Sequence, residues 1–234
     1  MGKIIAVVSG KGGTGKTSFT ANVGIALAEM GLRVLCVDCD ITLRNLDLAL
    51  GLSDSAMMDF CDVAKGRCAL ENATVSHRKY SCLHLLTAPQ TADALEVSQK
   101  QMLRLADEIR QNYDFCLIDA PAGLGLGFRL ATFCADSVVV VTTTDASALR
   151  DAQRTVMELS RFPAAACIWP WAACRKRCSR RCTPPLTTPS TWLACPSSAS
   201  SPRTAMSPPP STAALLCGTS ISTLPALTKI LPAA

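Results

Sequence analysis

No run of apolar residues in this sequence approaches the roughly 18 to 20 that a membrane-spanning helix needs, so we expect no helical membrane span. No cleavable signal pattern precedes the glycine-rich segment near residue 10. Both absences favour a cytoplasmic protein. The 49% apolar content excludes disorder throughout, and 234 residues are enough for one sizeable α/β domain.

Acidic residues are absent from the last third of the chain. Residues 1–160 hold 15 Lys+Arg and all 18 Asp+Glu, which gives −3, whereas residues 161–234 hold 8 Lys+Arg and no acid, which gives +8. Twelve of the 14 prolines and all three tryptophans also lie in residues 161–234. The composition therefore predicts an ordinary domain over residues 1–160 and an unrelated tail over residues 161–234.

A strand, a glycine-rich loop and a helix are predicted in succession near the N-terminus. The β-branched run from Ile4 to Val8 is typical of a strand buried on both faces. A helical pattern begins after the loop and stops at Gly31; its apolar face comprises Phe19, Val23, Ala26, Leu27 and Met30. The loop between them matches G-x-x-x-x-G-K-[ST] and predicts a phosphate-binding site formed by Gly10, Lys11, Gly12, Gly13, Thr14, Gly15, Lys16, Thr17 and Ser18.

Residue chemistry indicates what this loop binds. Glycines allow successive backbone N–H groups to turn toward a polyphosphate, and the helix N-terminus adds partial positive charge. We expect Lys16 to neutralise the β- and γ-phosphates and the Thr17 hydroxyl to ligate Mg²⁺. No N-K-x-D or T-K-x-D motif for reading guanine occurs, so the expected cofactors are ATP and Mg²⁺.

Two further apolar runs lead into carboxylates. Residues 34–37 precede Asp38 and Asp40, and residues 115–118 precede Asp119, which we expect to hold Mg²⁺ directly or through water. More strands are predicted at 83–86 and 138–141, with helices near 98–112 and 146–159. This alternation predicts a P-loop NTPase fold, a mostly parallel sheet with helices on both faces, incomplete in its C-terminal part.

The sequence resembles a known family at three motifs. GKGGTGKT, which contains Lys11, is similar to the deviant Walker A loop of the MinD/ParA ATPases; DCDITLRNLDLALG at residues 38–51 resembles the MinD branch, and DAPAG at residues 119–123 its second switch. The resemblance spans residues 1–160 and implies an ATPase that forms an ATP-dependent homodimer and regulates division-site placement. It implies that Lys11 reaches the partner subunit's nucleotide. It also implies that Asp40 orients or activates the attacking water and is a metal-site residue together with Thr17 and Asp119.

The resemblance also implies partners and a location. These are a hydrolysis-stimulating protein, a division inhibitor and anionic lipid at the inner face of the cell membrane; nucleic acid is not expected. One departure is visible, since Gly125 and Gly127 leave uncharged a segment where the family often has Glu. A ParA-like partitioning or flagellar-number ATPase, and an inactive nucleotide-binding fragment, stay open as alternatives.

Several other residues receive ordinary interpretations. Cys36 and Cys39 form C-x-x-C, but residues three apart on a strand point to opposite faces, so shared metal ligation is not expected. His77 and His84 lack a ligand cluster and are expected to be a loop and a strand residue. A solvated loop remains possible at residues 44–45, although the resemblance favours a switch near the nucleotide.

Three interpretations compete for the tail. The basic run at residues 175–181 suggests nucleic-acid or acidic-lipid binding, and Cys174, Cys178 and Cys182 suggest a metal site. The third interpretation, which we favour, is a reading-frame shift. With synonymous codons chosen freely, residues 183–212 in a shifted frame encode a peptide resembling the later part of MinD proteins. We therefore expect a poorly ordered tail that leaves the strand at residues 138–141 as an uncovered sheet edge.

Overall fold

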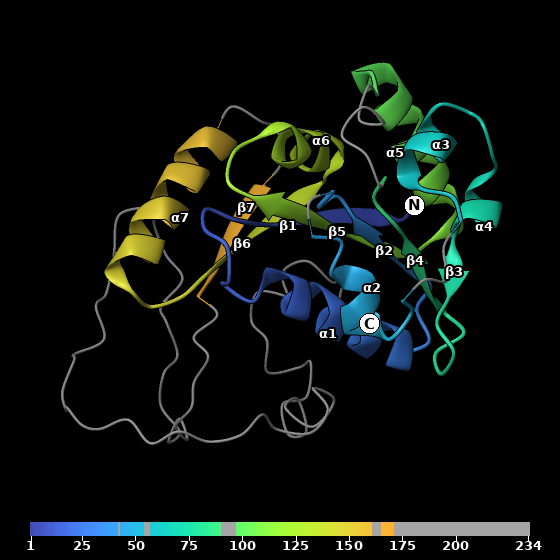
Figure 1. Ribbon diagram of the computed structural model, residues 1–234, viewed down its shortest axis with the longest axis horizontal. Helices are drawn as coiled ribbons and strands as arrows, with labels where there is room; N and C mark the ends of the chain where they lie inside the picture. Colours follow the sequence, from blue (N-terminus) through green and yellow to red (C-terminus); the bar gives the residue numbers. More distant parts are fainter. Residues whose placement is uncertain (42, 54–56, 90–96, 161–164, 171–234) are drawn as a thin grey trace. The chain divides into compact units, whose positions relative to one another are not determined.

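A computed structural model describes residues 1–41, 43–53, 57–89, 97–160 and 165–170 (Figure 1). Within these ranges seven strands form one sheet in the order β3-β4-β2-β5-β1-β6-β7, and every neighbouring pair except β3 and β4 is parallel. The strands are β1 (Lys3–Ser9), β2 (Val34–Asp38), β3 (Val75–Ser76), β4 (Leu83–Leu86), β5 (Phe115–Ala122), β6 (Ser137–Thr142) and β7 (Ala165–Pro170). The predicted parallel sheet is confirmed.

Helices cover both faces of this sheet (Figure 1). They are α1 (Lys16–Glu29), α2 (Leu46–Leu50), α3 (Phe60–Ala64), α4 (Leu70–Ala73), α5 (Gln99–Asn112), α6 (Leu126–Cys134) and α7 (Ala146–Leu159). Buried side chains of α1 and α2 belong to one hydrophobic cluster, and those of α3 to α7 belong to another. The chain thus builds helix–sheet–helix layers, as the alternation of strands and helices indicates.

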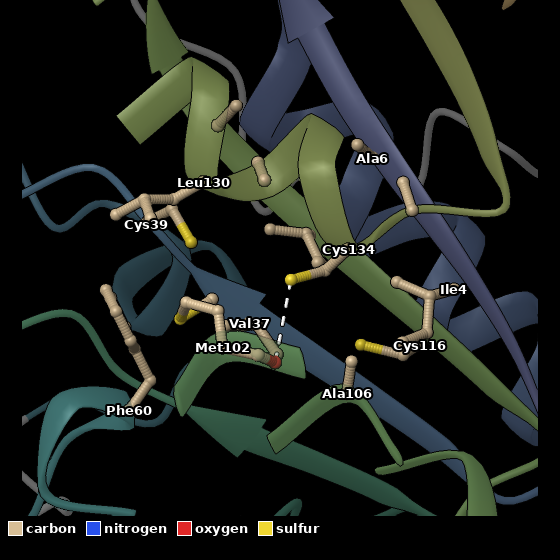
Figure 2. Close-up of a cluster of buried hydrophobic side chains, with 14 of the residues drawn as sticks. Ile4, Ala6, Val37, Cys39, Phe60, Met102, Ala106, Cys116, Leu130 and Cys134 are labelled. Carbon is tan, nitrogen blue, oxygen red and sulfur yellow. Dashed lines mark hydrogen bonds between the residues drawn. The ribbon is translucent and has the colours of Figure 1, made fainter. Parts of the chain in front are cut away.

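Side chains alternate between the two clusters along the central strands. In β1, Ile4, Ala6 and Val8 pack on the side of α5 and α6, whereas Ile5 and Val7 pack on the side of α1. Figure 2 shows the cluster on the side of α5 and α6, in which the Cys134 thiol lies 3.6 Å from the Met102 carbonyl oxygen. Each fully buried Ile, Leu or Phe contributes about 1.5–3 kcal/mol, so this alternation fixes the register of the strands.

Three positions are found where the pattern predicts them. Cys36 and Cys39 lie in different clusters and thus on opposite faces, as expected. His84 lies on β4, where its ring packs edge-on against Tyr113 with centroids 5.5 Å apart. The described helices include none that is both long and apolar enough to span a membrane.

Two boundaries differ from the prediction. β5 continues to Ala122, so Asp119 lies inside the strand; the continuation needs a register shift where β1 and β5 pair beyond Val7. The helix after the glycine loop ends at Glu29, and Met30 is 54% exposed instead of lying on the buried face. Both errors arise at element ends, where local pattern constrains the backbone least.

The expected free edge at residues 138–141 is wrong. β7 pairs in parallel with β6 from Ser137–Ala165 to Thr142–Pro170, although it lies in the segment that composition assigns to the tail. Pairing uses backbone groups, which any apolar run can offer, and the proline falls at the last residue of an edge strand, where it is tolerated. The remaining expectations for residues 171–234 lie outside the described residues.

Candidate functional site

The glycine loop joins β1 to α1 with two residues in the left-handed region, Gly13 at φ +76° and Gly15 at φ +87°. Only glycine adopts this conformation without strain. Gly10 is needed for another reason, because a Cβ there would lie 2.6 Å from the carbonyl oxygen of Asp151 in α7. A Cβ at Gly12 or Gly13 would meet no described atom within 4 Å, so this side of the loop borders open space.

Lys16 and Thr17 converge on one buried carboxylate. Lys16 Nζ donates to Asp119 Oδ1 at 3.0 Å, and Thr17 Oγ1 donates to Asp119 Oδ2 at 2.6 Å. Burial raises the pKa of Asp119, while the positive charge of Lys16 and the Thr17 hydrogen bond oppose the shift. The convergence of the loop lysine, the loop threonine and the strand carboxylate follows the prediction.

Thr20 is a member of this cluster that the motif does not include. Its hydroxyl donates to the carbonyl oxygen of Lys16 at 3.1 Å and lies 3.5 Å from Asp119 Oδ1. The signal available in the sequence is a hydroxyl residue one helical turn after the loop lysine.

A second buried carboxylate lies beside the first. Asp38 ends β2 and pairs in register with Asp119 of β5. Asp38 Oδ1 accepts from the backbone N–H of Asp40 at 2.8 Å, and Oδ2 accepts from that of Leu46 at 3.2 Å. Burial, reinforced by the charge of Asp119 and opposed by these hydrogen bonds, raises the pKa of Asp38 to about 7.

Asp40 lies in the loop that follows β2, half-buried. Its Oδ1 accepts from the backbone N–H of Leu43 at 3.2 Å, and its carbonyl oxygen accepts from that of Arg44 at 3.0 Å. Arg44 adopts φ +41°, and Asn45 is the N-cap residue of α2. These residues therefore belong to the loop that leaves the sheet beside Asp119, and their role as a switch stays a prediction.

Lys11 contacts its own chain. Its Nζ donates to Ser147 Oγ at 3.0 Å, and Ser147 Oγ donates to Asp145 Oδ1 at 2.7 Å. Asp145 also accepts from Thr143 Oγ1 and caps α7 through the backbone N–H of Ala148 at 3.0 Å; the Thr143 and Ser147 hydrogen bonds lower its pKa. Sequence reasoning missed Ser147, the α7 partner of Lys11, and Asp145 behind it, although Asp145 repeats the pattern of an acid placed after an apolar strand.

The uncharged segment after β5 is constrained at Gly123 and at Gly127. Gly123 has φ +86° and donates its N–H to the Ser9 carbonyl oxygen at 3.2 Å. A Cβ at Gly127, the second residue of α6, would lie 2.5 Å from Pro121 Cγ, so a larger side chain there requires Pro121 to move. A Cβ at Gly125 would meet no described atom within 4 Å, so nothing in the described structure requires glycine at that position. Leu124 and Leu126 are exposed, which makes this surface apolar where a charged one is common.

The loop fits a nucleotide phosphate and a hard cation. The Thr14 hydroxyl is buried and has no hydrogen-bond partner among the described residues, so a polar group at the loop would satisfy it. The backbone N–H groups at the start of the 14-residue helix α1 are oriented to bind an anion. Thr17, Asp119 and Asp40 carry the hydroxyl and carboxylate oxygens that Mg²⁺ prefers as ligands.

The raised pKa of Asp38 predicts a pH-dependent stability. The pKa of Asp38 is about 7 in the folded protein, against an ordinary value of 3.8. Between these two values the folded protein therefore binds more protons than the unfolded chain does. The free energy of unfolding should accordingly fall as the pH rises from about 4 to about 7. Urea unfolding at about pH 6 and about pH 8 should show higher stability at the lower pH, and Asp38→Asn should reduce the difference. An equal difference in the variant would contradict this assignment.

Comparison with known proteins connects this site to a family. Residues 2–164 match a family model described as an AAA domain. The septum site-determining protein MinD of Bacillus subtilis is 44% identical over 157 residues, covering 67% of this chain and 59% of that protein; MinD of Thermotoga maritima is 42% identical over 162 residues, covering 69% and 60%. The chain thus spans about 60% of the length of these curated relatives.

Solved structures give the same relation. The Pyrococcus horikoshii MinD complexed with Mg-ADP superposes with TM-score 0.63 at 36% identity, covering 71% of this chain and 68% of that one. Both the sequence and the fold of the described sheet therefore match. The chain belongs to the AAA-domain family of this model and, within it, to the MinD septum site-determining proteins.

Proposed function

We propose that residues 1–160 form a MinD-like ATPase that binds and hydrolyses Mg·ATP, dimerises with ATP bound, and regulates division-site placement at the membrane. The observation that carries the proposal is the convergence of Lys16 and Thr17 on Asp119 beneath a glycine loop that borders open space. Family membership supports the same assignment.

The chain's own residues account for binding. Lys16 exchanges its contact with Asp119 for phosphate oxygens, and the loop N–H groups and the Thr14 hydroxyl bind the remaining oxygens. Bound Mg²⁺ supplies positive charge to the phosphates, and Thr17 and Asp119 hold it, Asp119 directly or through water. Asp40 positions the attacking water from the neighbouring loop, where oriented groups act on the transition state.

Lys11 couples hydrolysis to dimerisation in this proposal. A lysine delivered across an interface places positive charge on the transferring phosphate only when two subunits meet. Lys11 must then leave Ser147, a single exposed hydrogen bond that costs little to break. In this proposal the hydrogen bond between Lys11 and Ser147 of α7 belongs to the monomer and is broken when the dimer forms.

Replacing Lys11 by alanine should spare most ATP binding and abolish dimerisation and turnover. The test uses a chain whose coding frame is restored after residue 160, with analytical ultracentrifugation and phosphate release in Mg·ATP. Lys79→Ala is the matched control, because Lys79 is an exposed lysine in the turn before β4, where it contacts Tyr80. Normal dimerisation and hydrolysis in Lys11→Ala would refute the role of the deviant loop.

The proposed partners follow from the family. We propose a division inhibitor, a hydrolysis-stimulating protein and anionic lipid, with the protein cytoplasmic and peripheral at the inner face of the membrane; nucleic acid is not a proposed partner. The solved MinC:MinD complex from Aquifex aeolicus, 37% identical with TM-score 0.63 over 71% of this chain and 67% of that one, supports the inhibitor.

We also propose that residues 161–234 are read out of frame. The acid-free composition supports this, and so does a family match that stops at residue 164. The family's membrane and adenine contacts would then be lost, which favours a second candidate function, a fragment that binds Mg·ATP without efficient turnover. Resequencing the coding DNA across codons 160 to 234 decides between a shifted frame and a genuine basic arm.

A further inference from the structure

Two buried carboxylates lie side by side at the site with different partners. Asp119 accepts from the side chains of Lys16 and Thr17 in the glycine loop. Its register partner Asp38, 2% exposed, accepts from backbone N–H groups of the loop after β2. The two acids therefore hold different parts of the site.

The hydrogen bonds of Asp38 close that loop at its base. The chain leaves the sheet just after Cys39, whose N–H still donates to the Asp119 carbonyl oxygen at 2.9 Å. It returns at Leu46, the first residue of α2, which is fully buried. The Asp38 carboxylate thus accepts hydrogen bonds at both ends of the loop. It accepts from the N–H of Asp40, where the chain leaves the sheet, at 2.8 Å, and from the N–H of Leu46, where the chain returns, at 3.2 Å.

We propose that Asp38 is a positioning residue, which ties Asp40 at the start of the loop after β2 to Leu46 at its end and thereby holds Asp40 at the nucleotide. The inference rests on the proposed ATPase function. Asp40 is held at its own N–H by Asp38, and its carboxylate and carbonyl oxygens both accept from backbone N–H groups within the loop. A shift at either end of the loop moves the group that positions the attacking water.

The closure requires a carboxylate. Two N–H donors face the two oxygens of one side chain, and each oxygen accepts one of them. Asparagine offers one acceptor oxygen, so Asp38→Asn sets an NH₂ group against one of the N–H donors. The loop then opens at one end, while Lys16, Thr17 and Asp119 keep their contacts.

The main experiment compares wild type with Asp38→Asn, both in the chain whose coding frame is restored after residue 160. We expect kcat for Mg·ATP to fall about 100-fold, while KM stays near the wild-type value, because a displaced group acts on the transition state more than on binding. Hydrogen exchange of the peptide covering residues 40–46 should become faster, whereas exchange in β5 should not change. Asp136→Asn is the control, since both Asp136 oxygens accept hydrogen bonds, from Ile4 N at 2.7 Å and Arg110 Nη2 at 2.9 Å, at the opposite end of β1.

Two further measurements keep the test decisive. If the frame-restored wild type does not hydrolyse ATP, the ATPase proposal fails alone, and hydrogen exchange still tests whether Asp38 holds the two ends of the loop. If Asp38→Asn unfolds, site-resolved exchange in wild type decides, because the N–H groups of Asp40 and Leu46 should be protected. Unchanged kcat together with unchanged exchange in Asp38→Asn, a loss confined to ATP affinity, or unprotected N–H groups in wild type would each overturn the inference.

Discussion

Replacing Lys16 by alanine should abolish Mg·ATP binding. The ammonium of Lys16 is buried 3.0 Å from Asp119, and the backbone N–H groups of the glycine loop alone do not replace its charge at the phosphates. Isothermal titration calorimetry should give saturable binding for wild type and none for the variant.

The variant also leaves Asp119 buried without its partner, and removing one member of a buried pair costs about 3–5 kcal/mol. Urea unfolding must therefore show that the variant is folded under the binding conditions. Lys79→Ala serves again as the control and should bind like wild type. Wild-type affinity in a folded Lys16→Ala variant would remove the phosphate-loop assignment.

Replacing Asp40 by alanine should leave ATP bound while hydrolysis falls by about 100-fold or more, because a group that positions water acts on the transition state. In the frame-restored protein an ATP-locked dimer should accumulate. Phosphate release and ultracentrifugation in Mg·ATP measure the two effects.

Asp47→Ala is the matched control for Asp40. Asp47 is a nearby carboxylate in α2 whose oxygen accepts from Leu48 N at 2.6 Å, and it contacts no member of the Lys16–Asp119 cluster in the described structure. It should lower stability slightly and leave turnover unchanged. Unchanged turnover in Asp40→Ala would place the water-positioning role on another residue.

Local pattern was sufficient for most of the fold. Continuous apolar runs rich in β-branched residues mark β1 and β6, and the 3.6-residue period marks α5 and α7, because burial on two faces or on one stripe imposes these spacings. The approach of Lys16 to Asp119 was also predictable, since the glycine loop and the acid both follow strands of one parallel sheet.

Contacts between distant segments were not predictable in this way. The Lys11–Ser147 hydrogen bond joins residues that are 136 positions apart in the sequence. The pairing of β7 with β6 depends on backbone groups, which are nearly the same in every residue type and so leave no pattern in the sequence. Asp38 was identified as an acid at a strand end, but its two N–H partners follow from the path of the loop up to Leu46. The sequence thus indicated the candidate site residues, but it did not indicate the hydrogen bonds by which Ser147 contacts Lys11 and Asp38 contacts the loop.

Hydrogen exchange of the wild-type chain with and without Mg·ATP tests the central claim most directly, because bound phosphates engage the N–H groups of the loop at residues 10–18. The account predicts slower exchange in residues 10–18 and in residues 38–46 when Mg·ATP is added, and no such change in Lys16→Ala. Exchange in residues 10–18 that Mg·ATP leaves unaltered, or equal protection in wild type and Lys16→Ala, would contradict it.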